Sequence, residues 1–240
     1  MHLAEATWTD VADADGRLAL LPTGSTEQHG PHAPLGTDSL AAEAVAAAGA
    51  EAHDEEVVVA PAVPVGVSEE HRAFPGTMWV SPDTFRAYVR EAVESLATHG
   101  RDRVVLVNGH GGNVDALAEV AARVSRDGGP TGDAHVVAFT WFDAVDADVP
   151  MGHAGGRETA LLRATEPDLV REDRVDAARE GGSDRWGEWV AGVNLAHDTD
   201  EFTDNGVIGD PAEGDAALGE AMLAAAGEEL SDLLDALAER

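Results

Sequence analysis

The 240-residue chain is predicted to fold as an α/β protein with three layers, in which helices cover both faces of a mainly parallel central sheet. Four short apolar runs alternate with segments whose apolar residues recur at a spacing of three and four. Parallel strands need crossover connections, and these are usually helical, so the alternation predicts the three layers. The apolar content of 44% is enough for one sizeable core, and no linker-like stretch interrupts it, so residues 1–240 are predicted to form a single domain.

Four buried strands are predicted from runs that are rich in β-branched and apolar residues and end at turn-forming residues. The predicted strands are Arg17–Pro22, Val57–Val65, Arg103–Val107 and His135–Trp141.

The segments between the strands have helical periodicity. Ser81 is a suitable cap, and Pro82 after it suits the first position of a helix. The last helix is predicted over Pro211–Leu237, where Gly219 and Gly227 are possible interruptions. The other predicted helices are Asp38–Ala52, Pro82–His99 and Val114–Arg126.

The charge of the chain is extreme, because 46 acidic residues and 15 basic ones give a formal net charge of −31. Such a surface repels nucleic acid and anionic lipid, and it is typical of adaptation to a high-salt cytoplasm, so the source is predicted to be a halophile. Met1–Glu5 begins no signal sequence and no apolar run could span a bilayer, so we expect a cytoplasmic protein without a membrane partner. Cysteine is absent, so nitrogen and oxygen atoms must hold any metal.

Polar clusters follow three of the predicted strands, at the edge of a parallel sheet where ligands bind. Glu27 and His29 would point to one face of an extended segment, and Asp38 follows at a probable helix start. Glutamate, histidine and aspartate suit Zn²⁺, Mn²⁺ or Fe²⁺. By spacing alone, surface residues and a helix cap explain the three equally well. His110 and His153, each in a glycine-rich turn, favour the metal site.

Six strings of residues, in order along nearly the whole chain, resemble the creatininase family. They are Gly24–His32, Leu35–Asp38, Phe74–Thr77, Asn108–Asn113, His153–Gly155 with Glu158–Thr159, and Gly206–Pro211.

This resemblance implies two divalent metal ions, which could be Zn, Fe or Mn. It implies that Glu27 and His29 bind different metals, that Asp38 bridges both, and that His110 joins Glu27. His153 matches a histidine that shuttles protons. The resemblance also implies a homo-oligomer, often a hexamer.

The chain departs from the creatinine-hydrolysing members at Gly111 and Gly112, where those members carry Tyr and Glu. That Glu ligates the second metal, so another ligand is needed. Glu158 is our candidate, either as this metal ligand or as a catalytic carboxylate that orients His153. Gly156 also stands where many relatives have Glu.

Two bridged metals would lower the pKa of a bound water, so a metal-bound hydroxide is expected to attack a small-molecule amide. His153 is then the natural proton donor to the leaving nitrogen. Residues of the neighbouring loops are candidates for contact with the substrate. They are His32, His71, Thr77, Gly111 and Gly112.

Four functions compete. The Gly111-Gly112 pair favours deformylation of a formylaminopyrimidine nucleotide, in flavin and deazaflavin (riboflavin-type) biosynthesis, as in archaeal members of the family. Its phosphate would need arginine or backbone amides at the pocket, and Arg72 or Arg157 could serve. Opening of creatinine, trimming of a cofactor precursor peptide, and a non-catalytic structural role are the alternatives. The segment 173–209, rich in Gly, Asp and Trp, is predicted to be irregular and to cover the site.

Overall fold

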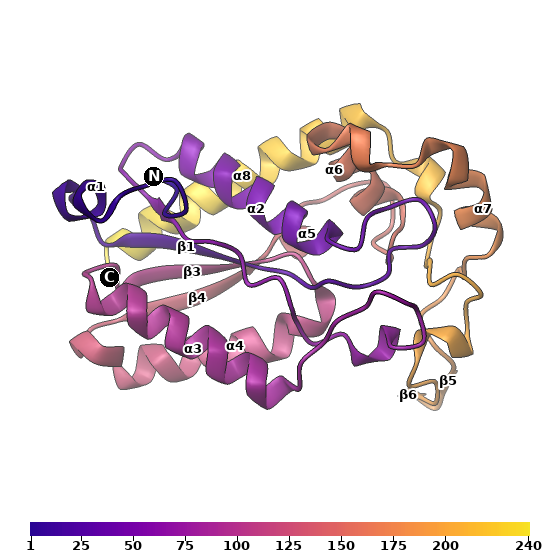
Figure 1. Ribbon diagram of the computed structural model, residues 1–240, viewed down its shortest axis with the longest axis horizontal. Helices are drawn as coiled ribbons and strands as arrows, with labels where there is room; N and C mark the ends of the chain where they lie inside the picture. Colours follow the sequence, from indigo (N-terminus) through magenta and orange to yellow (C-terminus); the bar gives the residue numbers. More distant parts are fainter.

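The computed structural model describes all 240 residues and confirms the three-layer α/β arrangement with a parallel central sheet (Figure 1). The order of the four strands is β2-β1-β3-β4, and every neighbouring pair is parallel. Leu20 in the inner strand β1 pairs with Val59 of β2 on one side and with Val105 of β3 on the other. The strands are β1 (Leu18–Thr23), β2 (Val58–Val59), β3 (Arg103–Asn108) and β4 (His135–Thr140).

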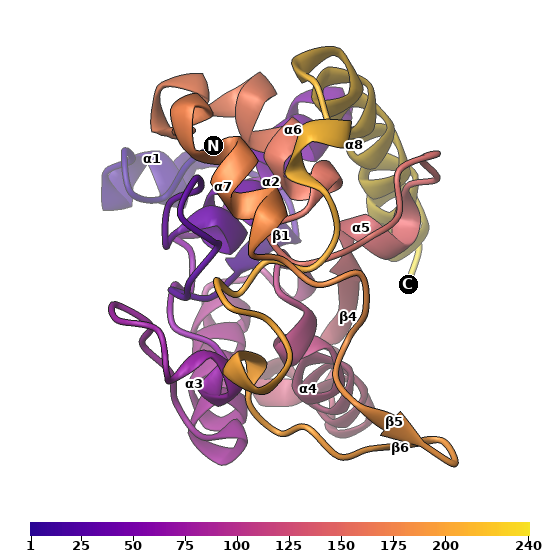
Figure 2. The ribbon, with the colours of Figure 1, turned by 90° about the vertical axis from the view of Figure 1, so that its right-hand side faces the viewer.

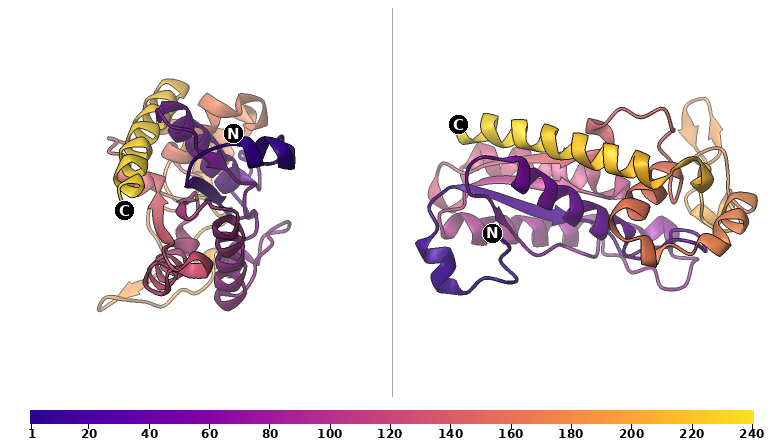
Figure 3. Two further views of the ribbon diagram at one scale, coloured as in Figure 1. Left: turned by 90° about the vertical axis from the view of Figure 1, so that its left-hand side faces the viewer. Right: turned by 90° about the horizontal axis from the view of Figure 1, so that it is seen from above.

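Helices cover both faces of the sheet, and the alternation of side chains along β1 supplies both cores. Leu18 and Leu20 pack with α2 (Thr37–Ala52) and α8 (Ala216–Ala238), whereas Ala19 and Leu21 pack with α3 (Pro82–Thr98) and α4 (Val114–Asp127). Figure 3 shows α2 and α8 running side by side over the sheet. The remaining helices are α1 (Trp8–Asp13), α5 (Trp141–Ala144), α6 (Gly156–Thr165) and α7 (Val175–Glu180).

The second strand is much shorter than the predicted Val57–Val65. Only Val58–Val59 is a regular strand, because Pro61 and Pro64 have no N–H to donate to a ladder. The chain nevertheless continues beside β1, where the N–H of Ala60 donates to Leu20 and that of Val63 donates to Pro22. The prediction was wrong in length and correct in place.

The last helix is continuous from Ala216 to Ala238, so the predicted interruption at its glycines was wrong. It also starts later than predicted, since residues 211–213 form a separate 3-10 turn. A Cβ at Gly219 would lie 2.0 Å from the carbonyl oxygen of Ala160, and Gly227 similarly faces Ala48. The glycines therefore allow close packing between helices. Neither α8 nor any other helix combines the length and apolar character needed to cross a membrane.

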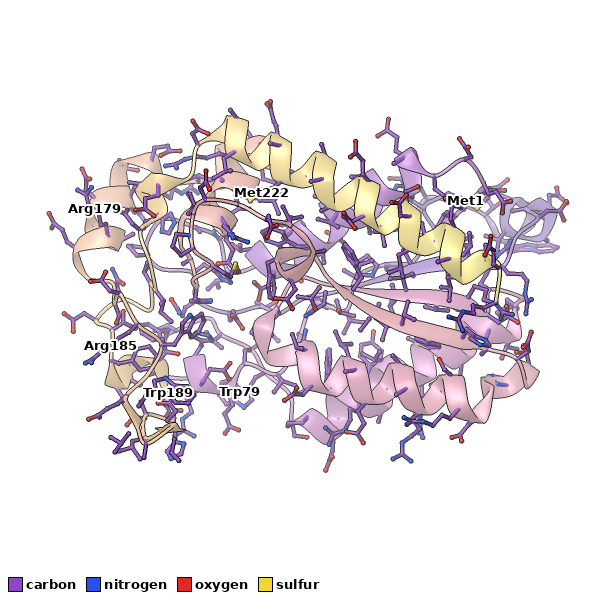
Figure 4. All side chains as sticks on the ribbon, turned by 180° about the vertical axis from the view of Figure 1, so that it is seen from behind. Met1, Trp79, Arg179, Arg185, Trp189 and Met222 are labelled. Carbon is purple, nitrogen blue, oxygen red and sulfur yellow. The ribbon has the colours of Figure 1, made fainter.

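The segment 173–209 is less irregular than predicted, because it contains α7 and a hairpin of β5 (Trp189–Val190) and β6 (Val193–Asn194). The side chains of Arg179, Arg185 and Trp189 lie along the end of the molecule that this segment forms (Figure 4). It crosses the carboxyl ends of the strands, as Figure 2 shows from that side. The backbone of Ile208 pairs with His153, so the segment contacts the predicted site.

Candidate metal centre

Five side chains that were predicted to bind metal come together at the carboxyl ends of the strands. Each comes from the first residues after a strand or from the first turn of a helix, and all five are buried. Glu27 and His29 follow β1, Asp38 lies in the first turn of α2, His110 follows β3, and Glu158 lies in the first turn of α6.

Asp38 lies between two groups of ligand atoms. Nδ1 of His110 is 3.2 Å from Oδ2 of Asp38 and 3.2 Å from Oε1 of Glu27. On the other side, Nε2 of His29 is 3.0 Å from Oδ1 of Asp38 and 3.8 Å from Oε2 of Glu158. The two oxygens of one carboxylate therefore face two different sets of donors.

The residues fit a pair of divalent cations. Both carboxylate oxygens of Glu27, Oδ2 of Asp38 and Nε2 of His29 are buried without any hydrogen-bond partner. Buried charges without partners cost several kcal/mol each unless they are paired or coordinate a metal. Three sets of residues have ligand atoms that lie within 4.8 Å of one another. Two of them share Asp38, namely Glu27, Asp38 and His110, then His29, Asp38 and Glu158, and the third is Glu27, His29 and His153.

The electrostatics of the cluster also favour positive charge. Burial opposes protonation of His29, but the carboxylates of Asp38, Glu158 and Glu27 outweigh it and raise the pKa of His29 to about 10. Burial raises the pKa of Glu158 to about 7, since the nearby carboxylates add to it. The cluster therefore contains more carboxylates than imidazoles, and the imidazoles do not fully balance its negative charge.

His153 lies against this cluster, with its ring stacked on that of His71 and tilted against that of His29. Its ring centroid is 4.4 Å from those of both His29 and His71. Its Nδ1 is 3.6 Å from Oε1 of Glu27, and its Nε2 donates to the backbone oxygen of Gln28 at 2.7 Å. Burial, together with the nearby His29 and His71, lowers the pKa of His153 well below its ordinary value. A neutral imidazole thus faces the candidate metal centre.

A small cavity of about 140 Å³ opens over the cluster. Three of the predicted substrate-binding residues line it, namely His71, Gly111 and Gly112. The other lining residues are Glu27, Glu70, His110, Phe142, Met151, Gly152, His153, Glu158 and Trp186.

His32 and Thr77 do not line this cavity, which differs from the prediction that they contact substrate. His32 is fully buried, and its Nε2 is hydrogen-bonded to the hydroxyl of Thr159 at 2.9 Å. The hydroxyl of Thr77 accepts the backbone N–H of Gln28 at 3.1 Å. Both side chains hold the loops that carry the site, because Nε2 of His32 and the hydroxyl of Thr77 bond to protein groups.

The two arginines that were considered for a phosphate are both engaged elsewhere. Arg157 donates to the backbone oxygens of Phe142, Val145, Ala147 and Val149. Arg72 pairs with Asp198 at 2.7 Å and with Glu69 at 3.5 Å, and neither arginine lines the cavity.

Several residues of the site were missed by the analysis of the sequence. Glu70 reaches the cavity from a 3-10 turn, and Phe142 and Met151 form part of its apolar wall. Trp186 completes this wall, although the sequence favoured a core position for it over a pocket wall. Gln28 is buried and contacts both His71 and His153. Gln28 and Glu70 lie next to predicted site residues, and this adjacency was the only available signal.

Comparisons with known proteins identify the family of this chain. The family model of creatininase, described as creatinine amidohydrolase, matches residues 4–234. The mycofactocin precursor peptide peptidase of Mycolicibacterium smegmatis is 37% identical over 212 residues, covering 86% of this chain and 80% of that protein. The creatinine amidohydrolase of Pseudomonas putida is 34% identical, covering 73% and 75%.

Solved structures of creatininase share the fold. A manganese form matches with a TM-score of 0.80 at 26% identity, covering 100% of this chain and 99% of that one. A mutant of the Zn–Zn type matches with a TM-score of 0.80 at 25% identity, covering 100% and 98%. The names of these two structures, of a Zn–Zn type and of a manganese form, show that proteins with this fold bind metal ions.

Proposed function

This chain belongs to the creatininase family and is a metal-dependent amidohydrolase, and we propose that it cleaves the terminal amide bond of a peptide that carries no phosphate group. The family description, creatinine amidohydrolase, refers to a carbon–nitrogen bond outside peptides. The Mycolicibacterium smegmatis relative is named for a precursor peptide. The finer choice of substrate therefore depends on the walls of the cavity.

The wall of the cavity carries this proposal. No arginine lines it, so a phosphate group would find no guanidinium there. Phe142, Met151 and Trp186 instead offer an apolar surface beside the candidate metal ligands. Such a surface suits an aliphatic or aromatic side chain next to the amide that is cleaved.

We assign one metal to Glu27, Asp38 and His110 and the other to His29, Asp38 and Glu158. Two divalent cations held by these residues supply Lewis acidity and make water more acidic. His153 accepts a proton from this water at Nδ1, which faces the centre, and then donates it to the leaving nitrogen of the amide. Because amide nitrogen leaves poorly without a proton, this transfer allows the carbon–nitrogen bond to break.

A formamide is the second candidate substrate. The Gly111-Gly112 turn places no side chain over the candidate metal ligands, and the cavity of about 140 Å³ suits a formyl group. This candidate applies to the formylaminopyrimidine as a base or nucleoside, since the cavity presents no arginine to a nucleotide phosphate. The non-catalytic alternative is not favoured, because five buried ligand residues converge and four of their polar atoms have no hydrogen-bond partner.

The test is a parallel assay of the Zn²⁺- or Mn²⁺-loaded protein in high salt. The substrates are short peptides that end in apolar residues, the formylaminopyrimidine nucleotide with its dephosphorylated form, and creatinine. We expect release of terminal residues from the peptides, and no activity in the matched variant Asp38→Asn. Turnover of the nucleotide but not of the peptides would refute the proposal and favour the deformylase.

A further inference from the structure

Gln28 occupies a position between two stacked histidines of the site. The rings of His71 and His153 have centroids 4.4 Å apart and planes inclined by 21°. Nε2 of Gln28 lies 2.9 Å from Nδ1 of His71 and 2.9 Å from Nε2 of His153. A single amide nitrogen therefore contacts both imidazoles.

The orientation of the Gln28 amide is fixed by two backbone groups. Its Oε1 accepts the N–H of Gly30 at 2.9 Å, and its Nε2 donates to the carbonyl oxygen of Gly206 at 3.0 Å. The reversed amide would place an oxygen against an oxygen and a nitrogen against an N–H. One of the two amide protons is thus used by Gly206, and one remains.

The remaining amide N–H can donate a hydrogen bond to only one of the two rings. Nε2 of His153 lies 2.7 Å from the backbone oxygen of Gln28, which can only accept, so this nitrogen carries a proton. It cannot then accept from the amide. The remaining amide N–H therefore donates a hydrogen bond to Nδ1 of His71. The hydroxyl of Thr199 lies 3.0 Å from the same nitrogen and supports this assignment.

Both rings are therefore protonated at Nε2, but they turn different nitrogens towards Glu27. His153 has a free lone pair at Nδ1, which is 3.6 Å from Oε1 of Glu27. His71 carries its proton at Nε2, which is 3.5 Å from the same oxygen. Both rings line the cavity, so one offers an acceptor and the other a donor to a bound substrate.

We propose that Gln28 is a positioning residue that holds His153 as the proton acceptor and His71 as a hydrogen-bond donor to the substrate oxygen. This inference rests on the proposed amide hydrolysis. As the carbonyl oxygen gains negative charge, the N–H of His71 stabilises it without a proton being transferred. A hydrogen bond that strengthens in this way raises kcat and leaves KM nearly unchanged.

Gly206 explains how the side chain of Gln28 fits. Its φ is +84°, and a Cβ there would lie 1.9 Å from Oε1 of Gln28. The Gly206–Pro211 string thus belongs to the site, because its first residue leaves room for the amide and accepts a hydrogen bond from it.

The test compares Gln28→Glu with Thr199→Val in the Zn²⁺-loaded protein. A glutamate has nearly the same shape but only accepts when ionised, so it should move the proton of His71 from Nε2 to Nδ1. We expect kcat to fall by about 100-fold with KM and zinc content unchanged, as for loss of one oxyanion donor. Thr199→Val removes only the supporting hydroxyl, so kcat should change less than about threefold.

Nitrogen-15 spectra of the imidazoles provide a readout that does not depend on turnover. The wild-type spectrum should show His71 protonated at Nε2 and His153 protonated at Nε2, with signals assigned from His71→Gln and His153→Gln. The glutamate variant should reverse His71 alone. A wild-type His71 protonated at Nδ1 would overturn the inference whatever the substrate. Inactivity on every amide, with the expected spectrum, would instead refute the proposed function.

Discussion

Replacing Gly112 by alanine should damage the metal centre, whereas the same change at Gly111 should not. A Cβ at Gly112 would lie 2.2 Å from the carbonyl oxygen of Val67 and 2.6 Å from Nε2 of His110. A Cβ at Gly111 meets no atom within 4 Å. Neither glycine has a positive φ, so the two variants differ in contact and not in backbone strain.

The size of the effect follows from the contact that is broken. His110 Nε2 is 2.8 Å from the carbonyl oxygen of Val67, so its Nδ1 is left to face Glu27 and Asp38. Relieving the overlap needs a shift of about 1 Å, and overpacking of this kind costs about 1–3 kcal/mol. Groups that orient a metal-binding histidine in this way are worth about 10–100-fold in metal affinity.

The assay is competition for Zn²⁺ against a chelator of known affinity, with a thermal unfolding curve for each variant. We expect Gly112→Ala to bind zinc about 10–100-fold more weakly, whereas Gly111→Ala should stay within about twofold of the wild type. Equal affinities in the two variants would show that the Val67 contact does not orient His110.

Three further predictions concern other parts of the molecule. Glu158→Gln should reduce the bound metal from about two ions per chain towards one, measured by elemental analysis, since only the set with His29 loses a ligand; two tightly bound ions would refute its role. Burial lowers the pKa of His32 to about 4, below the usual 6.5. The neutral ring therefore stabilises the fold above pH 6.5, and this stabilisation is lost as the pH falls towards 4. The loss approaches about 3 kcal/mol in chemical denaturation and should be missing in His32→Gln. Gly219→Ala should destabilise the protein by about 1–3 kcal/mol, because its Cβ would overlap the carbonyl of Ala160; an unchanged unfolding midpoint would refute this packing role.

The sequence predicted those parts of the fold that depend on local pattern. The strands at β1, β3 and β4 agree with the predicted ranges within about one residue, because unbroken β-branched runs leave little alternative. The strand predicted over 57–65 was too long, because the apolar pattern of this run includes two prolines whose missing N–H groups end the ladder. The expectation that Gly219 and Gly227 could interrupt the last helix failed for a different reason. Their role lies in contacts with other helices, which helical propensity does not report.

The same division holds for the site. Glu27, His29, Asp38 and His110 were predicted because each follows a strand or begins a helix, and the topology of a parallel sheet brings such positions together. Gln28 was missed although it lies between two of them. Its partners are 43 and 125 residues away, so its position between Glu27 and His29 in the sequence did not indicate which residues it contacts.

The role of Glu158 was left open between metal ligand and support for His153, and the geometry shows that these alternatives are compatible. Its Oε2 lies 3.8 Å from Nε2 of His29 and accepts the backbone N–H of Ala154 at 2.6 Å. Ala154 directly follows His153 and has a φ of 53°, a left-handed conformation that costs energy for alanine. The carboxylate that faces the second metal set therefore also holds the strained turn that presents His153, so loss of the metal ligand would disturb the proton acceptor as well.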